Sequence, residues 1–98
     1  MRYFSYISFE YTPKNKLHEQ VHEFLKANDR KIIEADKVDQ FKRHILSGIK
    51  KLNQANPKCN PIEAHWWNPA LIGKKDHLLN VGIGTICSFN LFHEESKN

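Results

Sequence analysis

Residues 18–22 of this 98-residue chain read HEQVH, and these side chains have the types and spacing of a hydrolytic metal site. Residues four apart lie on one face of a helix, so the imidazoles of His18 and His22 can reach one zinc ion. Glu19 could then act as the general base on a zinc-bound water molecule. The first hypothesis that the sequence raises is therefore a small zinc hydrolase, with Glu19 as its catalytic residue.

These five residues are similar to the H-E-x-x-H signature of the zincin metallopeptidases, and the resemblance covers only these positions. It implies a third protein ligand, since a catalytic zinc site needs three. The extended signature has a glycine and a histidine where this chain has Leu25 and Asp29. Lys16 and Glu23 bring charges beside the histidines, whereas zincins usually have uncharged residues there. We therefore interpret the match as a coincidence at the edge of a buried helix face, with a minimal zinc metallopeptidase as an alternative.

Two cysteine–histidine pairs share one spacing, Cys59 with His65 and Cys87 with His93, and raise the alternative of a structural zinc site. An extended segment of this length spans roughly 20 Å, which is too far for both members of a pair to bind one metal ion. The short cysteine and histidine spacings of zinc sites do not occur, and neither does a nucleophile-elbow or phosphate-loop motif. We accordingly predict that the protein has no cofactor and is not an enzyme.

The elements that would position these side chains follow from the spacing of apolar residues. This spacing predicts strands at 2–11, 62–67 and 78–92, and helices at about 13–27 and 36–55. Thr12 and Asp36 are the expected N-caps of the helices. Residues 31–34 fit a short strand or a linker, and 78–92 fits one long strand or two short ones. The order, roughly β-α-α-β-β, predicts an α+β fold with two helices packed on one face of a small, mainly antiparallel sheet.

The first predicted strand has aromatic residues on both faces, because Tyr3 and Phe9 point one way and Phe4 and Tyr6 the other. A strand that is covered on both sides would have this pattern. A strand with an aromatic binding face would have it too. The sequence leaves these two interpretations open.

Length and composition describe one folded domain over residues 1–98, with a frayed polar tail at about 93–98. No apolar run reaches the roughly 18 residues of a membrane span. The N-terminus lacks the continuous apolar stretch of a signal peptide. Two cysteines are too few for a disulfide scaffold. These observations predict a soluble cytoplasmic protein.

The stretch at residues 65–69, HWWNP, is the one most suggestive of a binding site. Adjacent strand residues face opposite ways, so at most one of Trp66 and Trp67 is expected to lie fully in the core. Tryptophan is enriched among interface hot spots. We therefore predict that one of the two anchors a partner, with burial of both as the alternative.

Basic residues give the chain a net charge of +4 and gather on the second predicted helix and in the polar turn at 73–76, which follows the predicted strand 62–67. Those expected to steer a partner are Lys42, Arg43, Lys50, Lys51, Lys74 and Lys75. Such a surface suits an acidic protein or a nucleic acid. A nucleic-acid-binding module is the alternative function, in which the basic helix would act together with stacking on strand aromatics. The glycine–aromatic pattern of RNA-binding sheets is absent, however.

The lead prediction is a small non-enzymatic protein-binding module. Frequent lysine, asparagine and isoleucine suggest an AT-rich genome. A small basic protein of this kind resembles the accessory proteins of phages and mobile elements. That resemblance implies an inhibitor that occludes the surface of a host enzyme.

Overall fold

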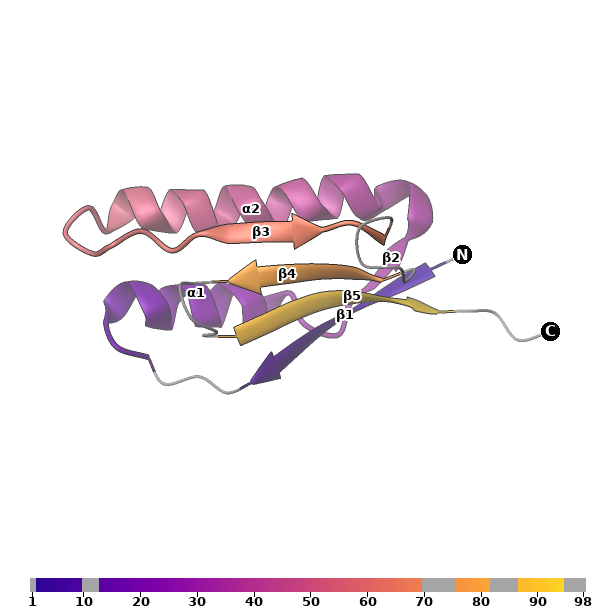
Figure 1. Ribbon diagram of the computed structural model, residues 1–98, viewed down its shortest axis with the longest axis horizontal. Helices are drawn as coiled ribbons and strands as arrows, with labels where there is room; N and C mark the ends of the chain where they lie inside the picture. Colours follow the sequence, from indigo (N-terminus) through magenta and orange to yellow (C-terminus); the bar gives the residue numbers. More distant parts are fainter. Residues whose placement is uncertain (1, 10–12, 70–75, 82–86, 95–98) are drawn as a thin grey trace.

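The protein forms one sheet with its helices on a single side, as Figure 1 shows for the computed structural model. The structure describes residues 2–9, 13–69, 76–81 and 87–94. In chain order, the elements are β1 (Arg2–Phe9), α1 (Lys16–Ala27), β2 (Ile32–Glu34), the 3₁₀ turn η1 (Ala35–Lys37), α2 (Val38–Ala55), β3 (Ala64–Trp67), β4 (His77–Val81) and β5 (Cys87–Glu94).

The five strands are ordered β2-β1-β5-β4-β3, and every neighbouring pair is antiparallel. Both helices lie on the same side of this sheet (Figure 1). The predicted α+β class is therefore confirmed, and the structure places the first and last strands, β1 and β5, in the interior of the sheet. Two details extend the predicted order. Residues 31–34 contribute the edge strand β2. The segment predicted at 78–92 corresponds to two strands, β4 and β5, which begin one residue earlier and end two residues later than predicted.

The core lies between the sheet and the helices. Phe89 on the central strand is fully buried, and its ring meets Phe41 of α2 at 6.2 Å and Trp66 of β3 at 6.3 Å between centroids. The predicted apolar stripes of both helices supply the buried residues Leu17, Val21, Leu25, Val38, Ile45 and Ile49. Burying one such side chain contributes roughly 1.5–3 kcal/mol, so this layer holds the helices against the sheet.

Helix α1 begins later than predicted and ends at Ala27 as predicted. Its first residue is Lys16, because the side chain of Asn15 accepts a 2.9 Å hydrogen bond from the backbone N–H of His18 and so caps the helix. The cap predicted from the sequence, Thr12, lies outside the described residues.

Helix α2 ends at Ala55 as predicted, but it begins at Val38, after the short turn η1. Asp36 lies within that turn and is therefore not the N-cap of the helix. The chain passes from β2 into α2 through these few residues only, which places the start of the helix close to the sheet edge.

The edge strand β2 is tied to β1 through Ser5, whose side chain is fully buried. The N–H of Arg30 donates to the Ser5 carbonyl at 2.8 Å, and the Ser5 N–H donates to the Lys31 carbonyl at 2.9 Å. Arg30 and Lys31 thus both lie opposite Ser5. This arrangement is a β-bulge, and it accounts for the left-handed backbone of Arg30 at φ 58°. The Ser5 hydroxyl also donates to the Asn28 carbonyl at 2.7 Å and accepts from the Lys31 N–H at 2.8 Å.

Two aspartates accept hydrogen bonds from backbone N–H groups of the interior strands β1 and β5. Each aspartate lies just before the strand that pairs with that interior strand. Asp29 Oδ1 accepts a bond from the N–H of Ile7 at 2.8 Å, just before β2. Asp76 Oδ1 accepts one from the N–H of His93 at 2.7 Å, just before β4. Each carboxylate therefore satisfies a backbone donor that the adjacent strand is too short to reach.

Candidate functional site

The face of the sheet opposite the helices carries a row of large apolar side chains that crosses all five strands. The half-buried Leu78 of β4 lies in register with Trp67 of β3. The other members, all exposed, are Ile32 on β2, Phe4 and Tyr6 on β1, and Phe92 on β5. We call these six residues the open-face row. Single exposed apolar residues are ordinary, but a contiguous group of them marks a binding surface.

Strand register brings the aromatic members of the row together. Phe4 lies opposite Ile32 on one side and Phe92 on the other. The rings of Tyr6 and Phe92 approach to 5.9 Å between centroids. Asn90, opposite Tyr6, is only 8% exposed although it lies on this face. Cross-strand pairs of this kind order their side chains, so the row is a preformed surface.

A shallow hollow of about 420 Å³ lies at the β2 end of the row. It is lined by Arg2, Phe4, Ile32, Phe92 and His93. The apolar residues form most of this lining, and Arg2 adds a charge that lies in register with Glu34 of β2. A hollow of this composition suits an apolar side chain of a partner.

The two tryptophans point to opposite faces of β3, as the alternation predicts. Trp66 is 8% exposed, and its indole N–H donates to the carbonyl oxygen of Lys42 on α2 at 3.2 Å. Trp67 is 38% exposed on the open face, with its ring edge-on to His65 at 5.3 Å between centroids. Of the two candidate anchors, only Trp67 is therefore accessible to a partner.

Lys42 joins α2 to the segments around β3 and β4. Its ammonium group donates to Asn68 Oδ1 at 2.7 Å, lies 3.1 Å from His77 Nδ1, and is 5.6 Å from the centroid of the Trp66 ring. The ring of His77 also meets that of Tyr3 at 5.2 Å between centroids. The half-buried Lys42 is thus engaged in contacts within the protein.

Burial lowers the pKa of Lys42, and the negative charge of Asp39 opposes this shift. Burial also lowers the pKa of His77, and the Lys42 charge lowers it further, against the opposing effect of Asp39 and Asp76. A neutral imidazole can accept a hydrogen bond from an ammonium group through Nδ1. The short contact and the lowered pKa therefore both indicate an uncharged His77.

The remaining predicted basic residues lie away from the open-face row. Arg43, Lys50 and Lys51 are exposed on α2, which covers the other side of the sheet (Figure 1). Lys74 and Lys75 lie outside the described residues. The structure therefore brings Trp66 and Lys42 into contact, but it does not join the exposed tryptophan to the basic residues of α2.

The H-E-x-x-H motif lies on α1, with His18 and His22 half-buried beside the core stripe of the helix and Glu19 exposed. His18 Nδ1 accepts a long hydrogen bond of 3.4 Å from the N–H of Lys14, and His22 Nδ1 lies 3.9 Å from a carboxylate oxygen of Glu23. Within the described part of the chain, no three His, Cys, Asp or Glu side chains are placed to hold a metal ion. A zinc site at this motif would need a ligand from elsewhere.

A comparison with protein families, curated proteins and solved structures found no match to this chain. In the described ranges, no helix has both the length and the apolar character needed to span a membrane. Function is therefore inferred from the surfaces and their side chains.

The open-face row was only partly foreseeable. Alternation within the first strand places Phe4 and Tyr6 on one face, and the structure shows that this face is exposed. Phe92 carried a usable signal, because it is a large aromatic on the otherwise small and polar face of the last strand. Ile32 gave no such signal in the sequence, because a strand as short as β2 shows no periodic alternation.

Proposed function

We propose that this protein is a non-enzymatic protein-binding module and that the open-face row is its contact surface. The observation that carries the proposal is the row itself, in which large apolar side chains from all five strands lie together on a face that the helices leave open. Tryptophan and tyrosine are among the side chains most enriched at interface hot spots. The sheet holds these side chains in place, so their ordering costs little when a partner binds.

The dimensions of the open face suit a protein partner. Neighbouring strands lie about 4.8 Å apart, so the sheet is roughly 20 Å across. An interface of standard size buries about 800 Å² on each side, which is the scale of such a face with its rim. The partner that fits this chemistry is a folded protein with an apolar patch. The net charge of +4 favours a partner that is acidic around that patch.

The distribution of charge gives less support to a nucleic-acid-binding module. Single strands bind where stacking aromatics and a basic groove follow one path. Here the aromatics lie on the open face, whereas the basic residues of α2 lie on the helical side of the sheet (Figure 1). A role as a phage-type inhibitor of a host enzyme stays a prediction from the sequence.

Affinity capture followed by binding measurements on the purified pair tests the proposal. The partner is captured from a lysate of the cells in which the protein acts, and its affinity is measured by calorimetry. Trp67→Ala and Phe92→Ala should each weaken binding at least about tenfold, equivalent to about 1.4 kcal/mol. Leu46→Ala is the matched control, because Leu46 is an exposed apolar residue on α2, away from the open face. Unchanged affinity in both open-face variants, or an equal loss in the control, would contradict the proposal.

A further inference from the structure

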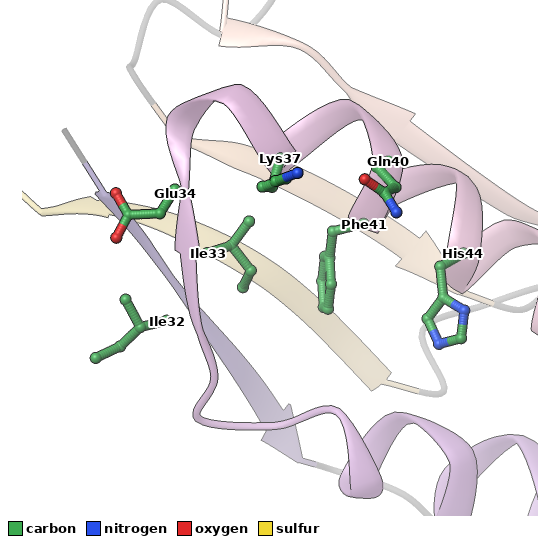
Figure 2. Close-up of a pocket in the computed structure, with 7 residues that line it drawn as sticks. All are labelled: Ile32, Ile33, Glu34, Lys37, Gln40, Phe41 and His44. Carbon is green, nitrogen blue, oxygen red and sulfur yellow. The ribbon is translucent and has the colours of Figure 1, made fainter.

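A second surface lies where β2 forms one edge of the sheet and α2 passes beside it (Figure 2). A groove of about 440 Å³ opens there. Its floor is apolar and is formed by Ile33 and Phe41, whose side chains point into the space between strand and helix (Figure 2). Lys37, Gln40 and His44 line the helical side.

The helical side of the groove is one continuous stripe. Lys37, the N-cap of α2, and the helix residues Gln40, Phe41 and His44 follow the i, i+3, i+4, i+7 spacing of one helix face. All of them except the half-buried Phe41 are exposed. The ring of His44 lies 5.7 Å from that of Phe24 on α1, so the first helix bounds the stripe at its far end.

The strand side of the groove offers unpaired backbone groups. β2 is the last strand of the sheet and pairs only with β1. The N–H of Ser5 donates to the carbonyl of Lys31, so the backbone groups of Lys31 face β1. Backbone direction alternates along an antiparallel strand. The N–H and C=O groups of Ile33 therefore also face β1, and those of Ile32 and Glu34 face away from it. The N–H groups of Ile32 and Glu34 therefore point to the free edge, with no acceptor among the residues that the structure describes.

A strand added to this edge would find an apolar contact on each of its faces. Its side chains on the helical side would lie over Ile33 and Phe41. Its side chains on the other side would lie beside Ile32 and Phe4. Ile32 is 59% exposed, the highest value among the exposed large apolar residues that the structure describes, and strand addition would cover it.

Charge at the groove favours an acidic occupant over a second copy of this chain. Lys31 and Lys37 are exposed and flank the β2 edge at its two ends. Glu34 also lines the groove, but its carboxylate points to the side of β2 away from Ile33, so Lys37 is the charged residue on the helical side (Figure 2). A second copy would bring the same lysines and a further net charge of +4, which opposes self-pairing.

We propose that the β2 edge binds an extended segment of a partner protein as a sixth strand, with an apolar side chain in the groove and acidic residues at the ends of the segment. Strand addition of this kind takes its affinity from main-chain hydrogen bonds and its specificity from pockets for alternate side chains. Because β2 has only 3 residues, the groove supplies a large part of the contact. This site adjoins the open-face row at Ile32 and Phe4, but its groove and its backbone edge do not require the row to be a contact surface.

Selection from a random peptide library displayed on phage tests the inference without knowledge of the partner. Enriched peptides should alternate apolar and polar residues and have acidic ends. A synthetic copy added to ¹⁵N-labelled protein should shift the amide signals of Ile32, Glu34, Gln40 and His44. Methylating the peptide N–H groups that face β2 should weaken binding at least about tenfold, whereas methylating the alternate N–H groups should have little effect.

Protein variants separate this site from the open face. Gln40→Trp should fill the groove and weaken peptide binding at least about tenfold. Gln54→Trp is the matched control, because Gln54 is exposed on the same helix roughly 20 Å further along. Trp67→Ala should leave peptide binding unchanged, so that failure of the open-face proposal would not be mistaken for failure of this one.

Three results would overturn the inference. The first is enrichment no greater than against an unrelated protein. The second is a set of shifted amide signals around Tyr6 and Trp67 instead of along β2. The third is a dimer in analytical ultracentrifugation that Gln40→Trp dissociates, since the occupant of the edge would then be a second copy of the chain.

Discussion

The ammonium nitrogen of Lys42 lies 3.1 Å from Nδ1 of His77, which joins two titratable side chains in one contact. This contact requires an uncharged imidazole, because a protonated one has no acceptor at Nδ1 and would place two positive charges side by side. The same ammonium group holds Asn68 at 2.7 Å. Lys42 therefore links α2 to the segment after β3 and to the start of β4, and this link depends on the protonation of His77.

Protonation of His77 should destabilise the fold. Burial, and then the Lys42 charge, lowers the pKa of His77 in the folded protein below its ordinary value of 6.5. The unfolded chain then binds the proton more readily, so the stability contributed by His77 is complete above pH 6.5 and is lost as the pH falls from 6.5 towards the folded pKa. The free energy of unfolding, measured by urea titration at several pH values, should decline over this window in the wild type.

Two variants isolate the contribution of His77. In His77→Gln the decline in stability below pH 6.5 should be smaller than in the wild type. His65→Gln is the matched control, because His65 is exposed on β3 and makes no contact with Lys42 that the structure records, so it should keep the wild-type profile. An unchanged profile in His77→Gln would show that Lys42 and His77 do not interact in solution.

The adjacent tryptophans should respond in opposite ways to truncation. Trp66→Ala removes a buried ring and its hydrogen bond to α2, so it should lower the free energy of unfolding by about 3–5 kcal/mol. Trp67→Ala should lower it by less than about 1 kcal/mol, because its ring lies on the surface. Urea denaturation followed by circular dichroism measures both. Similar losses of unfolding free energy in the two variants would mean that Trp66 and Trp67 do not occupy a buried and an exposed face of β3.

Burial patterns within an element could be predicted from the sequence, because they leave a periodic signal. Leu79 and Phe89 lie on the face that alternation assigns to the core, and the helix stripes are also correct. The start of α1 could not be predicted in the same way. Proline at residue 13 and the side chain of Asn15 are both acceptable start signals, and only the folded backbone selects between them.

The candidate surfaces depend on relations between distant residues, which local patterns do not contain. Aromatics on both faces of β1 fit either a covered strand or an open one, and the choice depends on where the helices pack. The groove arises because β2 falls at the sheet edge beside the start of α2, which no single segment encodes. The basic residues of α2 were visible in the sequence, but their separation from Trp67 was not.

Zinc should be present at far less than one equivalent in protein purified without a histidine tag. His18 and His22 have the spacing of a ligand pair, but the described residues place no third ligand beside them. Mass spectrometry of the metal content measures this directly. Stoichiometric zinc that disappears in His18→Ala would contradict the expectation and would return the hydrolase hypothesis to first place.

The two aspartates that bond to interior strands should each contribute to stability. Asp29→Ala leaves the N–H of Ile7 without its acceptor, and Asp76→Ala does the same to the N–H of His93. Removing a charged partner from a part-buried donor costs about 1–3 kcal/mol, measurable by urea denaturation. Asparagine at either position keeps an acceptor oxygen and should recover part of the loss. Asp36→Ala, at an exposed position in η1, is the control and should change stability by less than about 0.5 kcal/mol. A loss in Asp36→Ala as large as in the other two would mean that general charge effects, and not these hydrogen bonds, stabilise the strands.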